Sequence, residues 1–373
     1  MERYFAIASK FVVSRAEVIG VQPCGQGLIN DTYLVELSPF TTAMGADIPQ
    51  SFILQKLNTQ VFRQPERVMA NVRLFTTHAR DRLRQQPLPA GRRWEVPYVL
   101  SAADERDYWI DEDGSFWRAL SYVERTRSLD AVADLDCARE VGLALGTFHA
   151  LISDLDVARL SDTLEGYHIT PSYLQHYDAV LETRAPAPSE MAQYCQQFIR
   201  DRRQWASVLE DAKARGELLP RTTHGDPKVN NILFDTTTGQ AVSMIDLDTV
   251  KPGLVHYDIG DCLRSGCNPL GSSTKNYTDV TFETGLCRAI LQGYLTSARS
   301  FLSDRDCDYL FDAIRLIAFE LGLRFFTDYV EGNVYFKTRY PGHNLARAIV
   351  QFKLVESIEA QAATIQSIIS DLR

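Results

Sequence analysis

Side chains suited to phosphoryl transfer lie at characteristic spacings between residues 224 and 248. Asp226 is followed five residues later by Asn231, and Asp246 comes fifteen residues after that, at the end of an apolar strand pattern. Phosphoryl transfer needs a carboxylate beside the attacking hydroxyl and oxygen ligands that hold Mg²⁺ near the phosphates. We therefore predict Asp226 as the base and Asn231 and Asp246 as metal ligands, with Asp248 as a lower-ranked substitute ligand. Lys228 would neutralise charge on the moving phosphoryl group.

The alternative for this segment is an acidic loop with an asparagine turn, because His, Asp and Asn are common in loops. One His-x-Asp triplet would leave that alternative open. The whole set of matched positions, on a loop, strand, turn and second strand, favours the catalytic interpretation.

A glycine-containing segment upstream is a candidate ATP-binding loop. Gly25 and Gly27 lie between two strand patterns, where backbone N–H groups can approach phosphate oxygens. Asn30 and Thr32 could add hydrogen-bond donors. A simple hairpin turn is the alternative, and the position of this segment one lobe ahead of Asp226 favours nucleotide binding.

The strand pattern at 51–57 offers Lys56 to the phosphates, with Glu66 on the following helix as its partner. A shift of one residue would turn Gln55 toward the nucleotide instead, because successive side chains of a strand point to opposite faces. Lys56 and Gln55 therefore both remain candidates for the contact with the phosphates.

Hydrophobic periodicity divides the chain into two parts. Strand patterns and one helix, at 65–86, occupy the first third, and from about residue 125 the period becomes helical. This predicts an α+β, bilobed, protein-kinase-like fold, with an antiparallel β N-terminal lobe at 1–123 and a mainly α-helical C-terminal lobe at 124–373. The crossover is expected at 121–124, where the backbone of Tyr122 and Val123 would pair with adenine. The strand patterns lie at 18–23, 31–37, 51–57, 96–101, 107–110 and 115–122.

Composition narrows the classes of partner. The 373 residues include 39 basic and 48 acidic side chains, a formal charge of −9, which argues against nucleic acid or an anionic membrane as the main partner. No apolar run approaches the roughly 18 residues of a transmembrane helix, and the first residues lack a signal-peptide pattern. Seven cysteines without a CxxC pair fit a reducing cytoplasm.

The motifs resemble those of the aminoglycoside phosphotransferase and choline kinase superfamily, and more closely those of the N-acetylhexosamine 1-kinases. The matching segments are GxGxINDTYLV at 25–35, FILQKLN at 52–58, THGDPKVNNILFD at 223–235, MIDLDTVKPG at 244–253, YDIGDCLRSG at 257–266 and ELGLRFFTDYVEGNVYFKTRYPGHNLARA at 320–348. The resemblance implies an ATP- and Mg²⁺-dependent kinase that phosphorylates the anomeric hydroxyl of a free hexosamine. It also implies that Arg324 and Tyr335 contact the sugar.

Two positions depart from the family pattern. Leu28 stands where the family often has His on the sugar side, and the family can carry Gln where this chain has Lys56. The first departure leaves the preferred sugar open, and the second weakens the assignment of Lys56. Arg324 also has a structural alternative, an ion pair with Glu320 or Asp328 on the same helix.

Two other functions compete with that of a sugar kinase. A choline, homoserine, methylthioribose or aminoglycoside kinase is the first alternative, although Arg324, Lys337, Arg339 and Arg347 suit a neutral or acidic acceptor better. A pseudokinase would normally lack the base or a metal ligand. ATP and a small sugar are the expected partners, and the protein is expected to be a monomer or weak homodimer. Asp258 and Asp261 could brace the catalytic loop or cap a helix, and His149 is expected to be a packed residue.

Overall fold

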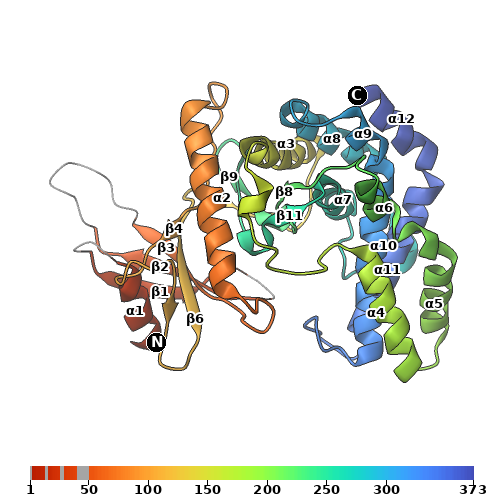
Figure 1. Cartoon of the computed structure of the whole chain (residues 1–373), viewed down its shortest axis with the longest axis horizontal. Helices are drawn as coiled ribbons and strands as arrows, with labels where there is room; N and C mark the ends of the chain where they lie inside the picture. Colours follow the sequence, from red (N-terminus) through yellow and green to blue (C-terminus); the bar gives the residue numbers. More distant parts are fainter. Residues whose placement is uncertain (1, 13–15, 26–28, 40–49) are drawn as a thin grey trace.

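The computed structural model describes residues 2–12, 16–25, 29–39 and 50–373, which form two lobes (Figure 1). The N-terminal lobe holds an antiparallel sheet with the strand order β1-β2-β3-β6-β4, and β5 pairs with β6. Its strands are β1 (Val18–Pro23), β2 (Asp31–Leu37), β3 (Ser51–Lys56), β4 (Val99–Leu100), β5 (Trp109–Ile110) and β6 (Phe116–Ser121).

Two helices cover opposite faces of this sheet. Helix α1 (Glu2–Ala8) lies on the outer face, and α2 (Pro65–Gln85) stands between the sheet and the C-terminal lobe (Figure 1). Phe52 and Leu54 of β3 pack in the cluster that includes α1. Phe116 and Leu120 of β6 belong instead to the main core, with the apolar side of α2. The alternation of side chains along each strand therefore decides which residues face the second lobe.

The C-terminal lobe is mainly helical. Its helices are α3 (Leu135–Ile152), α4 (Thr170–Thr183), α5 (Glu190–Arg202), α6 (Val208–Ala214), α7 (Val255–Gly266), α8 (Thr284–Ala298), α9 (Asp304–Asp308), α10 (Leu310–Glu331), α11 (His343–Ala360) and α12 (Ala362–Leu372). Two small antiparallel sheets are set among them, β10-β9-β7 and β11-β8. Their strands are β7 (Thr126–Arg127), β8 (Arg221–Thr223), β9 (Ile232–Asp235), β10 (Ala241–Met244) and β11 (Lys251–Gly253).

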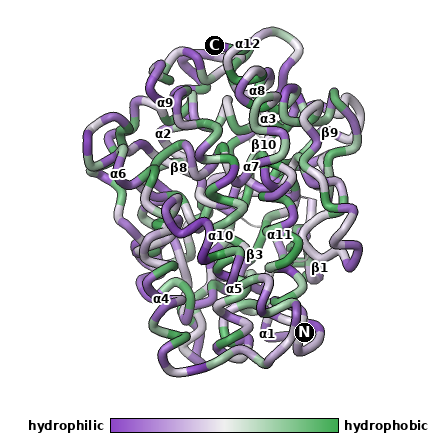
Figure 2. Tube along the Cα trace, turned by 90° about the vertical axis from the view of Figure 1, so that its right-hand side faces the viewer, coloured by the Kyte–Doolittle hydropathy of each residue, from purple (hydrophilic) through white to green (hydrophobic). Residues whose placement is uncertain are grey.

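The core of this lobe is apolar and its rim is polar. In the hydropathy view, hydrophilic segments follow the outer helices α4 and α6, whereas hydrophobic segments lie toward the middle (Figure 2). In the described part of the chain, no helix has both the length and the apolar character needed to span a membrane.

The predicted α+β, bilobed fold is confirmed, and the predicted strands at 18–23 and 31–37 match β1 and β2. The helical character expected after residue 125 is also seen, and the region 304–331 forms two helices, α9 and α10. Strand β6 is the last strand of the N-terminal sheet in chain order, and the next strand, β7, pairs with β9 of the C-terminal lobe. We therefore propose a lobe boundary near residue 123.

Helices α3 and α8 cross so closely that glycine is required at the contact. A Cβ at position 142 would clash with the carbonyl oxygen of Ile290, and one at position 293 would clash with the carbonyl oxygen of Arg139. This crossing places His149 of α3 beside Tyr294 of α8.

We expect Gly142→Ala to lower the free energy of unfolding by about 1–3 kcal/mol, the usual cost of overpacking a rigid core. Gly285→Ala is a matched control on α8, because its Cβ would meet only Leu135, at 3.9 Å. Denaturant unfolding of both variants is the measurement. Equal stability of the two variants would contradict the tight crossing.

Candidate active site

The loop between β8 and β9 brings three predicted site residues together. Lys228 donates from Nζ to Oδ2 of Asp226 at 2.5 Å. Asn231 donates from Nδ2 to the carbonyl oxygen of Asp226 at 2.8 Å and to its Oδ2 at 3.1 Å. Burial alone would lower the pKa of Lys228, but the charges of Asp226 and Asp246 outweigh burial and raise the pKa to about 12. Lys228 is therefore a permanent cation beside the Asp226 carboxylate.

A buried carboxylate braces this loop from behind. Asp258, on α7, accepts hydrogen bonds from the backbone N–H groups of His224 (2.6 Å) and Gly225 (2.8 Å). His149 Nε2 lies 2.8 Å from Oδ2 of Asp258, and His149 Nδ1 lies 3.0 Å from the Tyr294 hydroxyl. Burial favours the neutral acid, yet the hydrogen bonds from His149 and the loop leave the pKa of Asp258 lowered. Asp258 is thus a brace rather than a helix cap, and His149 does more than pack.

The turn at Gly225 also depends on backbone geometry. Gly225 has φ of 86°, and a Cβ there would lie 2.8 Å from Thr249. Thr249 donates from its hydroxyl to the carbonyl oxygen of His224 at 2.7 Å. The Asp226 loop and the segment after β10 are thereby held against each other.

Asp246 follows β10 in a left-handed conformation, with φ of 65°. Asp246 is solvent-exposed on one side. Even so, desolvation by the surrounding protein and the charge of Asp248 raise the pKa of its carboxyl to about 6, although the charge of Lys228 acts in the opposite direction. Non-glycine residues rarely adopt this conformation, which is enriched at functional sites.

The donor set near Asp246 fits Mg²⁺. Among the described residues, Oδ1 of Asn231 accepts no hydrogen bond, so this amide oxygen and the Asp246 carboxylate are both available as ligands. Mg²⁺ in kinases is held by one or two such protein oxygens, with phosphate oxygens and water completing the shell. No cluster of three or more acidic, His or Cys side chains forms a protein-only metal site in the described ranges.

Asp248 points to the other lobe instead of joining Asp246. Its side chain is 3% exposed and forms an ion pair with Arg118 of β6, which is 1% exposed. Asn30 donates from Nδ2 to Asp248 Oδ2 at 2.5 Å and accepts from the backbone N–H of Asn58 at 2.9 Å. Asp248 is therefore engaged between the lobes, which removes the basis for ranking it as a substitute metal ligand. The Asn30 amide is likewise engaged between the lobes, and its assignment as a phosphate donor stays a prediction.

The strand register decides between Gln55 and Lys56. Gln55 lies opposite Arg118 on β6 and accepts from its Nε (3.0 Å) and Nη2 (2.7 Å). Gln55 also donates from Nε2 to the Thr32 hydroxyl at 3.0 Å. Lys56 belongs to the opposite face of β3, with Phe52 and Leu54. This register argues against the assignment of Lys56 to the phosphates, which stays a prediction, and in the described part of the chain Lys56 and Glu66 form no ion pair.

The remaining nucleotide-site predictions are partly described. Gly25 has φ of 76°, as a tight turn requires, whereas Gly27 and Leu28 lie outside the described residues. Val123 accepts from the Thr126 hydroxyl through its carbonyl oxygen at 2.8 Å. Its N–H has no partner among the described residues, and Tyr122 precedes it in the same extended segment after β6. The expected pairing with adenine through Tyr122 and Val123 stays a prediction.

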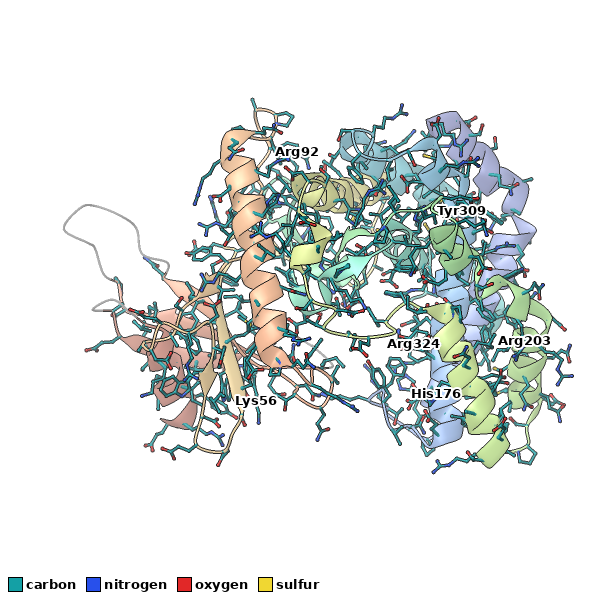
Figure 3. The ribbon with its side chains drawn as sticks, viewed as in Figure 1. Lys56, Arg92, His176, Arg203, Tyr309 and Arg324 are labelled. Carbon is teal, nitrogen blue, oxygen red and sulfur yellow. The ribbon has the colours of Figure 1, made fainter. Side chains whose placement is uncertain are left out.

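Arg324 of α10 lies in a cage of aromatic rings. Its guanidinium carbon is 4.8–5.9 Å from four ring centroids, those of Tyr167, Tyr173, Tyr335 and Phe336. Figure 3 shows Arg324 on α10 in the C-terminal lobe and Lys56 far away at the N-terminal sheet. Arg324 makes no hydrogen bond in the described part of the chain, and its ion pair with Glu320 is loose, at 4.0 Å.

Glu320 forms only a long ion pair with Arg324 because other donors hold its carboxylate. His168 Nδ1 lies 2.9 Å from Glu320 Oε1, and the Thr170 hydroxyl donates to Oε2 at 2.7 Å. His168 Nε2 lies 2.8 Å from the carbonyl oxygen of Gly225. The Arg324 cage and the Asp226 loop are thus joined through one buried imidazole, which sequence reasoning missed because its partners lie far apart in the chain.

Asp328 is also not the partner of Arg324. Its carboxylate accepts from the backbone N–H groups of Val334, Tyr335 and Phe336, at 2.7–3.1 Å. Asn344 donates to it from Nδ2 at 2.7 Å. Asp328 therefore fixes the loop that carries Tyr335 and Phe336 into the cage.

Comparison with known proteins agrees with this geometry. The model of APH, the phosphotransferase enzyme family, matches residues 20–296. The chain resembles the microcompartment-associated aminopropanol kinase at 15% identity, with 98% of each chain covered and a TM-score of 0.59. It resembles an aminoglycoside phosphotransferase from Alicyclobacillus acidocaldarius at 14% identity, covering 98% of this chain and 96% of that one, with a TM-score of 0.60. For choline kinase from Cryptosporidium parvum the values are 13% identity, 98% and 97% coverage and a TM-score of 0.60.

The buried His168–Glu320 pair predicts a pH-dependent contribution to stability. Burial lowers the pKa of His168, but Glu320 more than offsets this, so the pKa is raised in the folded state. The stabilisation is then fully present below about pH 6.5, the unfolded value, and is lost as pH rises through the folded pKa. We expect His168→Asn, which tolerates the φ of 62° at this site, to lower stability by about 3–5 kcal/mol at low pH and by less at high pH.

Melting curves between pH 5.5 and 9 measure this difference. His176→Asn is the matched control, because His176 pairs with Glu331 at an exposed site and should contribute at most about 1 kcal/mol. A loss in His168→Asn that is the same at every pH would contradict a charged imidazole at position 168.

Proposed function

Because the chain belongs to the phosphotransferase enzyme family, we propose that it transfers the γ-phosphoryl group of ATP to a hydroxyl of a small molecule, with Mg²⁺ as cofactor. The acceptor that we propose is the anomeric hydroxyl of a free N-acetylhexosamine, which gives the sugar 1-phosphate. The observation that carries the proposal is the joined pair of features described above, the Asp226, Lys228 and Asn231 loop and the Arg324 cage.

Asp226 is the proposed base. A single carboxylate oxygen, Oδ2, is held by both Lys228 and Asn231, so its orientation is fixed before the acceptor binds. An anomeric hydroxyl is more acidic than other sugar hydroxyls because the ring oxygen withdraws charge, and it needs little base strength. Positioning and charge stabilisation then dominate the rate.

Lys228 and Asn231 assist from either side of Asp226. Lys228 supplies positive charge where the phosphoryl group moves. Asn231 and Asp246 would hold Mg²⁺, which when bound neutralises phosphate charge. The presence of Asp226, Asn231 and Asp246 together argues against a pseudokinase.

The charge around the acceptor argues against choline and aminoglycosides. A cationic acceptor would meet the guanidinium of Arg324, which lies among four neutral rings and whose ion pair with Glu320 is long, at 4.0 Å. The guanidinium fork suits hydroxyl and N-acetyl oxygens, and Tyr335 adds a ring at the edge of the cage. Together with the family resemblance of 320–348, this favours a hexosamine.

The cysteines bear on the cellular setting that we propose. The seven cysteines are all free thiols, which fits the cytoplasmic location that we propose. A monomer or weak homodimer stays a prediction.

A coupled ADP-release assay tests the function. Purified protein is offered N-acetylglucosamine, N-acetylgalactosamine, choline, homoserine, methylthioribose and an aminoglycoside. We expect turnover with the N-acetylhexosamines and a loss of about 10²–10⁴-fold in kcat for Asp226→Asn, the usual contribution of a general base, at nearly unchanged sugar affinity. Turnover with choline alone would refute the hexosamine assignment, and near-normal turnover of Asp226→Asn would remove Asp226 as base.

Removing the Arg324 fork should weaken acceptor binding alone. A hydrogen bond from a charged donor contributes about 1.5–3 kcal/mol, so Arg324→Ala should raise the sugar KM by about ten- to a hundredfold. The ATP KM should change little, because Arg324 contacts only the cage. Steady-state kinetics with each substrate varied separately measure this, with a melting curve as folding control. An unchanged sugar KM in a protein of reduced stability would show that the role of Arg324 is structural.

A further inference from the structure

A cluster of basic side chains lies beyond the Arg324 cage. We call Lys275, Arg339, His343 and Arg347 the basic cluster; they come from the loop after α7, the loop after α10 and the start of α11. The ammonium of Lys275 lies 5.7 Å from the ring centre of Tyr340. Arg339 donates its backbone N–H to His343 Nδ1 at 3.3 Å, and Arg347 contacts the Ser273 hydroxyl at 3.5 Å.

These charges have no acidic partner. Among the described residues, none of Lys275, Arg339 or Arg347 forms an ion pair, in a chain whose formal charge is −9. The nearby carboxylate of Asp328 is already saturated by four hydrogen-bond donors. Elsewhere lysines that lie close together are neutralised. Lys213 and Lys251, which line a cavity of about 220 Å³ behind the catalytic loop, pair with Glu210 and Asp162.

The electrostatics agree with an unfilled requirement for negative charge. Burial and the charge of Arg339 lower the pKa of the Arg347 guanidinium. Burial, with the charges of Arg347 and Arg339, also lowers the pKa of His343. Burial and the neighbouring positive charges therefore both disfavour the charged forms of these groups, and a bound anion would offset this cost.

The basic cluster adjoins the proposed acceptor site. The guanidinium of Arg347 lies 5.3 Å from the ring centre of Phe325, which is 4.6 Å from the ring of Phe336. Phe336 in turn borders the guanidinium of Arg324, at 5.5 Å. Two rings thus separate Arg347 from Arg324. In Figure 1 the loop between α10 and α11 projects from the C-terminal lobe toward the N-terminal lobe.

We propose that the basic cluster binds an oxyanion, a phosphate, sulfate or carboxylate group, beside the acceptor site. The preferred source is an acidic substituent on the acceptor itself, so that the natural substrate is an acidic hexosamine derivative; a free inorganic anion is the other source. The start of α11, where no side chain caps the helix, adds partial positive charge. The choice of a sugar as the carrier rests on the proposed function, whereas the anion site itself does not.

The first experiment measures anion binding without activity. Melting temperatures are recorded in sodium phosphate, sodium sulfate and sodium chloride at equal ionic strength. We expect phosphate and sulfate to stabilise the wild-type protein relative to chloride, and Arg339→Gln/Arg347→Gln to lose that difference. Arg200→Gln removes one positive charge from an exposed position on α5. It is the single-charge control and should keep the difference between the salts. Because Arg347 also packs on Phe325, the single variant Arg339→Glu provides a second test that leaves this packing intact.

The second experiment compares acceptors that differ in charge. N-acetylglucosamine, its 6-phosphate and its 6-sulfate are assayed for ADP release. We expect kcat/KM for an acidic sugar to exceed that for the neutral one by about tenfold or more. The double variant should lose this preference, with a larger fall in kcat/KM for the acidic sugars than for the neutral one.

The outcomes separate the two proposals. Anion stabilisation that depends on Arg339 and Arg347, without a preference for acidic sugars, supports the site and assigns it to a free anion. Equal melting temperatures in all three salts, or equal anion effects in wild type and the variants, overturn the site. Failure of every sugar as acceptor refutes the proposed function, and the melting experiment still decides the anion site.

Discussion

The buried ion pair of Arg118 and Asp248 is the constraint on which the arrangement of the two lobes depends. Two charges removed from water cost several kcal/mol each unless their remaining hydrogen-bonding capacity is met. Gln55 receives two N–H groups of Arg118, and Asn30 donates to Asp248. Since Asp248 is two residues from Asp246, this pair couples β3 and β6 to the segment that presents Asp246.

Two buried groups of the C-terminal lobe hold the loop that carries Asp226. Asp258 receives the backbone N–H groups of His224 and Gly225 from one side. His168 meets the carbonyl oxygen of Gly225 from another side. Donor and acceptor of one peptide segment are therefore both satisfied by side chains, which leaves little freedom for Asp226. Such pre-organisation is what positional catalysis requires.

The sequence predicted local features well and long-range partners poorly. The spacing of Asp226 and Asn231 reflects one short loop, so their contact could be foreseen. The structure disfavours the predicted contact of Lys56 with the phosphates, because strand parity, not residue type, decides which side chain faces the second lobe. The sequence predicts only a packing role for His149 and no role for Arg118, because each acquires its role from a partner more than a hundred residues away. No local sequence pattern encodes a contact between residues so far apart in the chain.

The parity of β3 has a consequence for chemical labelling. In kinases with a lysine on the third strand, a nucleophilic amine stands beside the nucleotide phosphates. Here that face presents the amide of Gln55 and, across the strand pair, the guanidinium of Arg118. Neither group is an effective nucleophile at neutral pH. An amine-directed nucleotide analogue would therefore meet no amine on this face of β3 among the described residues, and Lys228, which stays protonated beside Asp226, would react slowly with it.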